Sequence, residues 1–188
     1  MRKVVSGLFV SLDGVVEAPH LWQFDVFDKD MEEVMIKFLA DIDTALLGRV
    51  TYQEWAPYWS SFSGEGGDQA YADFINNTPK YVASTTLDRL DWQNSTLIRG
   101  ALAGTIQRLK AETGRTIAVQ GSPTLVRSLM AEGLLDELTL MIHPVVAGRG
   151  KRLFPGDEEL MQLTLIDSRI TASGVAILTY QPHTRNGN

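Results

Sequence analysis

Hydrophobic and polar residues follow two alternating periods along this chain, and each change of period marks a predicted element. Short apolar or alternating runs have the length and composition of strands; they cover residues 4–12, 43–47, 80–84, 95–99, 116–120, 134–146, 163–170 and 175–180. Apolar residues at helical spacing predict helices over 30–39, from 48 onward, over 69–76, over 104–112 and from Pro123 onward. In the last of these, Leu125, Val126, Leu129 and Met130 share one face.

The order of these elements indicates the fold class. Strands and helices alternate through most of the chain, as they do in parallel α/β units. The last strands, 163–170 and 175–180, follow each other with no helix between them, which favours an antiparallel extension. We therefore expect a mixed, mostly parallel sheet with helices on both faces, formed by one domain over residues 1–188.

Two glycines stand where a strand passes into a helix. Gly48 precedes Thr51-x-x-Glu54, which has the spacing of a capping box. Gly121 precedes Ser122 and Pro123, residues suited to the N-cap and to the first helical position. Such junctions direct free backbone N–H groups at one point and favour an anion there. A glycine that merely begins a helix is the competing interpretation, and it stays open.

Composition narrows the function classes. The net charge is −6, from 17 basic and 23 acidic residues, which argues against nucleic-acid binding because a basic surplus is missing. No apolar run approaches the ~20 residues of a membrane span, and the N-terminus has the pattern of a strand, not of a signal peptide. The chain has no cysteine, which fits a cytoplasmic location. Its 3 histidines lack metal-ligand spacing, so we expect no metal.

Other polar residues near strand ends have two possible roles each. Ser84-Thr85-Thr86 could bind a phosphate or ribose, or form a hydroxyl-capped turn. Asp13 could be a turn residue or a substrate contact, and Trp22 could be a pocket wall or a core residue. The basic loop, defined as residues 147–152, could approach an anionic ligand or be solvated.

Several motifs together resemble a known family. They lie, in chain order, at residues 11–14 (SLDG), 47–51 (LGRVT), 121–125 (GSPTL), 133–137 (GLLDE), 144–148 (PVVAG) and 150–154 (GKRLF). In this order they resemble the C-terminal reductase domain of riboflavin-biosynthesis deaminase–reductases, which has the dihydrofolate-reductase fold. No zinc-ligand motif of the deaminase half occurs in these 188 residues, so the chain looks like a stand-alone member.

The resemblance implies NADPH as cofactor. Four residues would lie near the adenosine phosphates, with Arg49 at the 2′-phosphate: Gly48, Arg49, Val50 and Thr51. Ser84 and Thr85 would lie near the adenine ribose. Five residues would surround the pyrophosphate: Gly121, Ser122, Pro123, Thr124 and Leu125. The backbone of Ser6 would lie near the nicotinamide carboxamide.

The substrate side departs from the family pattern. Gln120 replaces the glutamate that usually precedes the glycine pair, which removes a charge at an expected substrate position. Asp13 is our candidate for a polar substrate contact, with Trp22 as a pocket wall. Asp30 and Glu32 both lie in the helix region where dihydrofolate reductases carry their proton-donating carboxylate, so the catalytic residue remains open.

The leading hypothesis is an NADPH-dependent, homodimeric reductase. It would transfer hydride to a C=N or C=O group of a small heterocyclic or sugar-like substrate. The alternative hypothesis is a non-catalytic, dimeric module that binds a nucleotide or a pterin without turnover.

Overall fold

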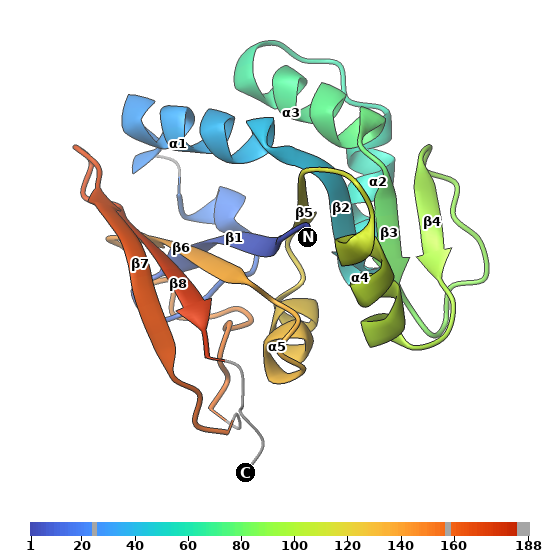
Figure 1. Cartoon of the computed structure of the whole chain (residues 1–188). Coiled ribbons are helices and arrows are strands. Elements are labelled where there is room, and N and C mark those ends of the chain that lie inside the picture. The colour runs from blue at the N-terminus through green and yellow to red at the C-terminus, as the bar shows by residue number, and fades with distance from the viewer. Residues whose placement is uncertain (24–25, 157–158, 184–188) are drawn as a thin grey trace.

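The computed structural model describes residues 1–23, 26–156 and 159–183, and one eight-stranded sheet forms its centre. The strands are β1 (Val4–Ser11), β2 (Ile42–Gly48), β3 (Lys80–Ala83), β4 (Ser95–Ile98), β5 (Thr116–Val119), β6 (Glu137–His143), β7 (Leu163–Ile170) and β8 (Ala176–Pro182). Their order across the sheet is β4-β3-β2-β5-β1-β6-β8-β7. Every pair from β4 to β6 is parallel, and β8 pairs antiparallel with both β6 and β7. The predicted mostly parallel sheet with antiparallel C-terminal strands is confirmed (Figure 1).

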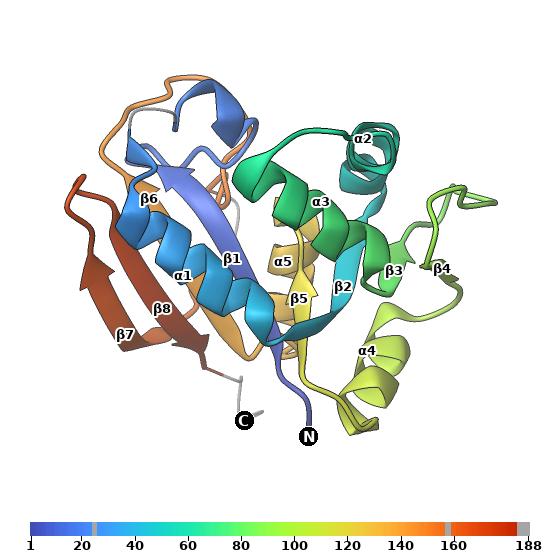
Figure 2. The same cartoon turned by 90° about the horizontal axis from the view of Figure 1, so that it is seen from above.

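Helices cover both faces of the sheet. They are α1 (Lys29–Ala40), α2 (Arg49–Ser60), α3 (Gly66–Asn77), α4 (Leu102–Ala111) and α5 (Pro123–Ala131), with a short 3-10 helix η1 at Pro19–Leu21. The helices α1 and α3 lie on one face, and α4 and α5 lie on the other (Figures 1 and 2). Packing agrees with this division, because Val5 of β1 contacts the α1 side while its neighbour Val4 belongs to the cluster under α4 and α5.

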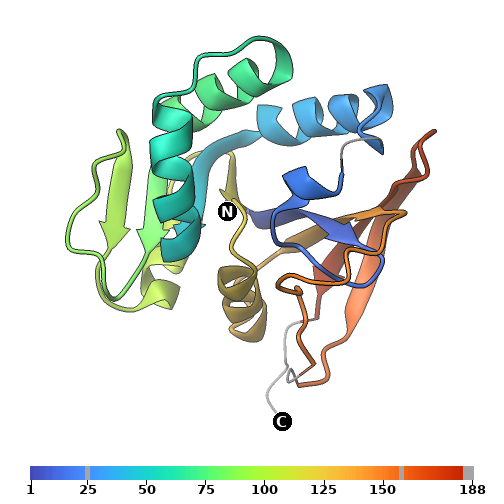
Figure 3. The ribbon, with the colours of Figure 1, turned by 180° about the vertical axis from the view of Figure 1, so that it is seen from behind.

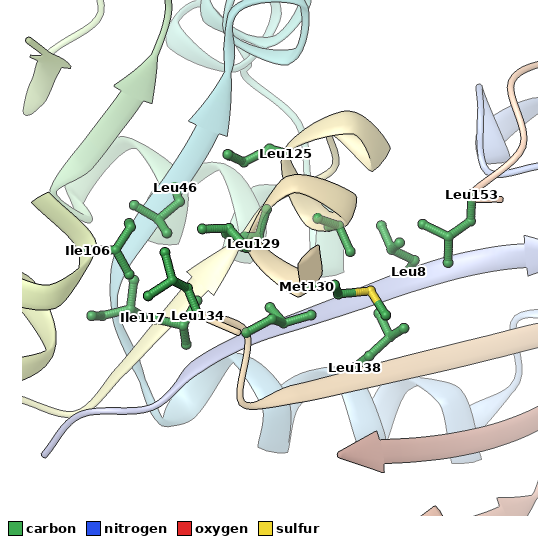
Figure 4. Packing of buried hydrophobic residues seen from close by; sticks show 14 of the residues in the cluster. Leu8, Leu46, Ile106, Ile117, Leu125, Leu129, Met130, Leu134, Leu138 and Leu153 are labelled. Atoms are coloured by element: carbon green, nitrogen blue, oxygen red, sulfur yellow. The ribbon is translucent and has the colours of Figure 1, made fainter. Parts of the chain in front are cut away.

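The largest apolar cluster lies between the sheet and the helices α4 and α5 (Figure 4). All four residues predicted to share a face of α5 are buried there: Leu125, Val126, Leu129 and Met130. They contact Leu46 of β2 and Leu138 of β6, on opposite sides of β5 and β1. This packing fixes α5 across the sheet, and it fixes the start of α5 at the carboxyl end of β5.

Three local sequence interpretations are corrected by the structure. Because β2 runs to Gly48, α2 begins at Arg49, so Thr51 is a buried first-turn residue and caps nothing. The small, polar and glycine-rich composition of residues 60–68 predicts a surface loop over the whole segment, but α2 ends at Ser60 and α3 begins at Gly66. The chain end, residues 182–188, is predicted to be a frayed tail, but Pro182 belongs to β8; residues 184–188 lie outside the described part of the chain.

The strands end at different heights in the middle of the sheet. The ladder between β1 and β5 stops at Ser6↔Val119, whereas the ladder between β1 and β6 continues to Ser11↔His143. The segment 7–11 of β1 therefore extends beyond the end of β5. The chain leaves β1 toward the α1 face and leaves β5 toward the α5 face. Neighbouring strands whose connections leave on opposite faces create a crevice at their carboxyl ends, where α/β proteins bind ligands.

The helices of the described residues include none that combines the length and the apolar character needed to cross a membrane.

Candidate functional site

The two glycine junctions meet at the carboxyl edge of β2 and β5, as neighbouring parallel strands require (Figure 3). A β-carbon at Gly48 would collide with Oγ of Ser122. One at Gly121 would lie 3.2 Å from Cγ2 of Thr51, closer than most real contacts. Each glycine thus faces the first residues of the other helix, and side chains at these positions would force the two junctions apart. We call residues 48–51 and 121–125 together the cradle.

Backbone strain is concentrated in one arm of the cradle. Gly121 and Ser122 are both left-handed, with φ of 60° and 57°. Glycine adopts this conformation freely, but serine pays on the order of 1–3 kcal/mol for it. The sequence correctly places Ser122 at the N-cap, yet its side chain does not cap the helix. Non-glycine residues in this conformation cluster at ligand sites, where the surrounding structure maintains them.

The helix N-termini in the cradle are not neutralised by the protein itself. Neither α2 nor α5 has a side-chain cap or an acidic residue in its first turn. The contrast is α1, where the carboxylate of Asp28 accepts a hydrogen bond from the N–H of Met31, and Asp30 and Glu32 occupy the first turn. First-turn N–H groups have no intrahelical acceptor, and the helix dipole makes that end partly positive. The cradle is therefore suited to an anion supplied from outside.

Arg49 adds a full positive charge at the start of α2. Its side chain lies on the surface, where Nη1 donates to Oε1 of Gln53 at 2.8 Å. Val50, also exposed, follows it. An exposed arginine that donates to a neutral amide, and has no ion pair among the described residues, keeps its charge available for a phosphate.

The third predicted cofactor segment, at the end of β3, is a closed turn. Oγ of Ser84 accepts hydrogen bonds from the N–H groups of Thr86 and Leu87, at 3.1 and 3.0 Å. This is the hydroxyl-capped turn that the sequence left open as an alternative. Thr85, at its tip, is exposed. Contact of either residue with a ribose stays a prediction.

The interior end of the crevice holds two buried polar side chains with unpaired atoms. Ser6 is fully buried in β1, and its Oγ has no hydrogen-bond partner among the described residues. Gln120 directly follows β5; its backbone N–H donates to Leu46 and its Oε1 accepts from the hydroxyl of Tyr71 at 3.2 Å. Nε2 of Gln120 is buried without a partner in that same part of the chain. Burial also raises the pKa of Tyr71, which keeps the phenol protonated.

Asp13 ties the basic loop to the end of β1. Its carboxylate accepts hydrogen bonds from Oγ of Ser11 (2.6 Å) and from the N–H groups of Ala147 (3.0 Å) and Gly148 (2.9 Å). These bonds, that from Ser11 first, lower the pKa of Asp13 to about 2. Such an acid is ionised at neutral pH and is a poor proton donor. Its predicted contact with substrate stays a prediction, but its structural role is clear.

Cations of the basic loop are partly neutralised. Arg152 lies 3.4 Å from the carboxylate of Asp13, and Nζ of Lys151 lies 3.2 Å from that of Glu17. These contacts hold the basic loop against the segment that follows β1. The third cation of the loop, Arg149, forms no ion pair with the described residues.

The two acidic candidates of α1 do not converge on the crevice. The carboxylate of Asp30 pairs with Arg169 and accepts a hydrogen bond from the N–H of Ala172, at the turn between β7 and β8. Glu32 is exposed on the helix surface. Neither carboxylate is therefore placed as a proton donor to a ligand between β1 and β5.

Trp22 packs against His143, whose position in a strand beside Pro144 predicts only a packed or edge histidine. Its indole lies edge-on to the ring of His143, with 5.5 Å between the centroids. Phe9 of β1 contacts the same imidazole at 5.6 Å. We call Phe9, Trp22 and His143 the aromatic corner. The three residues lie far apart in the sequence, so no local pattern could have revealed it.

Two hollows lie away from the cradle. One, of about 450 Å³, is at the amino ends of the strands and is lined by residues that include Asp43, Phe74 and Arg115. The other, of about 270 Å³, is lined by residues of β1 and β6 with Leu153 and Phe154. No group of three or more potential metal ligands occurs in the described ranges.

The order of the strands and the helices on both faces of the sheet define a dihydrofolate-reductase-like fold. The dihydrofolate reductase of Enterococcus faecalis, solved with NADP(H), matches with a TM-score of 0.61 and 12% identity, over 97% of either chain. More narrowly, the chain belongs to the RibD C-terminal domain family, whose model matches residues 2–178. The resemblance found in the sequence is thereby confirmed.

One relative in sequence and two solved structures are similar over nearly the whole chain. The Bacillus subtilis protein called "Uncharacterized protein YyaP" is 30% identical over 179 residues, which is 95% of this chain and 94% of that protein. A Shewanella sp. PV-4 protein named after riboflavin biosynthesis has a TM-score of 0.76 at 19% identity, covering 97% and 99% of the two chains. The riboflavin biosynthesis reductase Rib7 of Saccharomyces cerevisia has a TM-score of 0.62 at 14% identity, covering 97% and 89%.

Proposed function

We propose that this protein is an NADPH-dependent reductase that transfers hydride to a C=N or C=O carbon of a small heterocyclic or sugar-like substrate. The observation that carries the proposal is the meeting of two uncapped helix N-termini at Gly48 and Gly121. Two anion sites side by side suit a dinucleotide, which carries several phosphates along its length. Membership of the RibD C-terminal domain family supports the same assignment.

The residues present fit this cofactor in their chemistry. The two glycines let the helix starts approach each other, because β-carbons at both would meet the opposite helix start, so the first-turn N–H groups of both helices would serve one ligand. Arg49 would bind the 2′-phosphate that distinguishes NADPH from NADH, through its planar, permanently charged fork. Ser84 and Thr85 would lie near the adenine ribose. When bound, NADPH supplies the hydride.

The segment 7–11 of β1 would serve the reacting end of the cofactor. It extends past the end of β5, beyond the last paired residue Ser6. A strand edge without a neighbour presents backbone N–H and C=O groups, and a carboxamide can pair with both. The backbone of Ser6, together with the residues that follow it, would therefore lie near the nicotinamide carboxamide.

Proton delivery would come from water. The carboxylates of Asp13 and Asp30 are both held by hydrogen bonds and ion pairs, and the phenol of Tyr71 has a raised pKa. The protein would contribute orientation and exclusion of bulk water at the aromatic corner. That none of these three described groups is a free acid is also the observation that favours the second candidate, a module that binds a nucleotide or pterin without turnover.

We also propose that the protein works in the cytoplasm as a homodimer. The edge strand β7 exposes Leu165, Ile166 and Ile170 by 49%, 47% and 65%. Exposed apolar edge strands are ready to pair with another chain, and a second copy pairs symmetrically. Light scattering should give a dimer for the wild type and a monomer for Ile166→Lys; a monomeric wild type would refute this part.

A cofactor titration tests the main proposal. NADPH fluorescence should change saturably on addition of protein, and NADPH should then be oxidised with at least one member of a panel of cyclic imines, lactams and small carbonyl compounds. Saturable binding without oxidation against the whole panel favours the non-catalytic module. The absence of binding at high micromolar NADPH refutes both candidates.

A further inference from the structure

His143 is a buried histidine with one unused nitrogen. It is the last residue of β6 and is 0% exposed. Nδ1 lies 2.9 Å from the backbone carbonyl oxygen of Met141. Nε2 is buried and has no hydrogen-bond partner among the described residues. Leaving a buried polar atom unpaired costs free energy, so folding alone does not favour a histidine here.

The bond at Nδ1 determines what Nε2 can offer. A carbonyl oxygen only accepts, so Nδ1 must carry the hydrogen in this contact. Burial lowers the pKa of His143, which favours the neutral ring. In the neutral ring with hydrogen on Nδ1, Nε2 is a hydrogen-bond acceptor. The protein therefore keeps an unpaired acceptor on a ring that Phe9 and Trp22 contact.

The surroundings of that acceptor suit a flat ligand. Phe9 and Trp22 meet the imidazole edge-on, at 5.6 and 5.5 Å, and Phe27 packs against Phe9 at 6.3 Å. Phe9 belongs to segment 7–11 of β1, which borders the crevice next to β5. Aromatic faces bind planar rings through stacking and apolar contact, and they give a sugar few partners for its many hydroxyl groups.

Trp22 is weakly held for a residue that covers a buried site. It is partly exposed, and its Nε1 donates one bond, to the carbonyl of Glu17 at 3.1 Å. The preceding helix η1 contains no buried residue and starts from Ala18 in a left-handed conformation, with φ of 47°. A ligand that stacks on Phe9 can therefore replace the indole at low cost.

We propose that His143 is the substrate-recognition residue, whose Nε2 accepts a hydrogen bond from a ring N–H of a planar nitrogen heterocycle that displaces Trp22. This inference rests on the proposed reductase function and sharpens it, because it chooses a heterocycle with lactam-type N–H donors over a sugar-like substrate. His143 acts by binding; the hydride and proton transfers involve other groups.

Lumazine and 1,3-dimethyllumazine are a matched pair of probes. Both are planar bicycles of the same skeleton, and only lumazine has ring N–H donors. With NADP⁺ present, the wild type should bind lumazine at least 10-fold more tightly than the dimethyl compound, with a change in tryptophan fluorescence that Trp22→Phe abolishes. His143→Phe should weaken lumazine at least 10-fold and erase the preference, whereas His143→Gln, which keeps an acceptor, should retain part of it.

The controls separate recognition from folding. Because His143→Phe removes an unpaired buried atom, its melting temperature should equal or exceed that of the wild type, and its affinity for NADPH should be unchanged. A large drop in melting temperature would make the imidazole structural and overturn the proposal. So would a wild type that binds both probes equally or neither at about millimolar concentration; this comparison needs no variant to fold.

The two proposals fail in different ways. If NADPH does not bind but lumazine binding depends on His143, the reductase assignment fails and the recognition site stands. If NADPH binds and lumazine affinity is indifferent to His143, the cofactor assignment stands and the recognition site fails.

Discussion

The two sides of the crevice are built on opposite principles. The cradle uses backbone N–H groups at two helix starts. It requires glycine at positions 48 and 121, because a β-carbon on Gly48 or Gly121 would meet the opposite helix start. The aromatic corner uses large side chains from three distant points of the chain, with one nitrogen at its centre. A site made of backbone N–H groups binds a chemical group that many ligands carry, such as phosphate. A site made of side chains discriminates, so the difference assigns cofactor binding to one side and substrate choice to the other.

The largest effect is expected when a β-carbon is added to the cradle. Gly48→Ala should collide with Ser122 and separate the two helix starts, weakening NADPH by about 100-fold, equivalent to about 2.8 kcal/mol. Overpacking should also lower the free energy of unfolding by about 1–3 kcal/mol. Cofactor titration and urea unfolding measure both effects.

Gly104 of α4 provides the control. A β-carbon there would meet nothing within 4 Å, so Gly104→Ala should stabilise the protein by about 0.5–1 kcal/mol through helix propensity. It should leave NADPH affinity unchanged. Equal losses of NADPH affinity in the two variants would mean that the cradle is not the cofactor site.

Arg49 tests whether the cradle selects NADPH over NADH. Arg49→Ala should weaken NADPH by about 10- to 100-fold, which is the worth of charge-assisted hydrogen bonds to a phosphate. NADH, which lacks the 2′-phosphate, should be affected far less. Arg89→Ala removes another exposed arginine, paired with Asp91, and should change neither affinity. If NADH and NADPH weaken equally, Arg49 does not read the 2′-phosphate.

The buried imidazole gives the aromatic corner a pH signature. Burial lowers the pKa of folded His143 below its ordinary value of 6.5, so the unfolded chain binds this proton more readily. Stability should therefore fall as pH drops below 6.5, with a slope of at most about 1.4 kcal/mol per pH unit from this one group. His143→Phe should reduce that slope in urea unfolding between pH 5 and 7. Identical slopes would show that His143 is not kept neutral by the fold.

The smallest expected effect concerns the basic loop. Asp13→Asn removes the carboxylate that accepts from Ala147 and Gly148, so amide hydrogen exchange at these two residues should accelerate while global stability changes little. In the wild type the same acceleration should appear only as pH falls from the ordinary pKa of 3.8 toward 2, where Asp13 becomes protonated. Unchanged exchange would mean that Asp13 does not hold the basic loop.

The fold and the cradle could be predicted from the sequence because their signals are local. Strand and helix periods, and the Gly-Ser-Pro turn before α5, depend on neighbouring residues. Parallel strands bring their carboxyl ends to one edge, so the meeting of Gly48 with Gly121 follows from topology. Even here one local pattern is misleading, since the capping-box spacing at Thr51 and Glu54 lies inside α2, which begins at Arg49 directly after the predicted Gly48 junction.

The aromatic corner could not be predicted, because it depends on tertiary contacts. Phe9, Trp22 and His143 come together only through the register of β1 with β6 and the path of the segment after β1. The two roles of Asp13 and of Ser84 could not be separated for the same reason. Only the structure shows the backbone N–H groups that occupy the Asp13 carboxylate and the Ser84 hydroxyl.

Amide chemical-shift mapping with NADP⁺ is the most direct test of whether the cradle binds the cofactor, because it locates the binding site without requiring a substrate. We expect saturable chemical-shift changes at residues 48–51 and 121–125, continuing along segment 7–11 of β1. Saturable shifts centred elsewhere, for example on the hollow around Asp43 and Arg115, or no shifts at high micromolar cofactor, would contradict it.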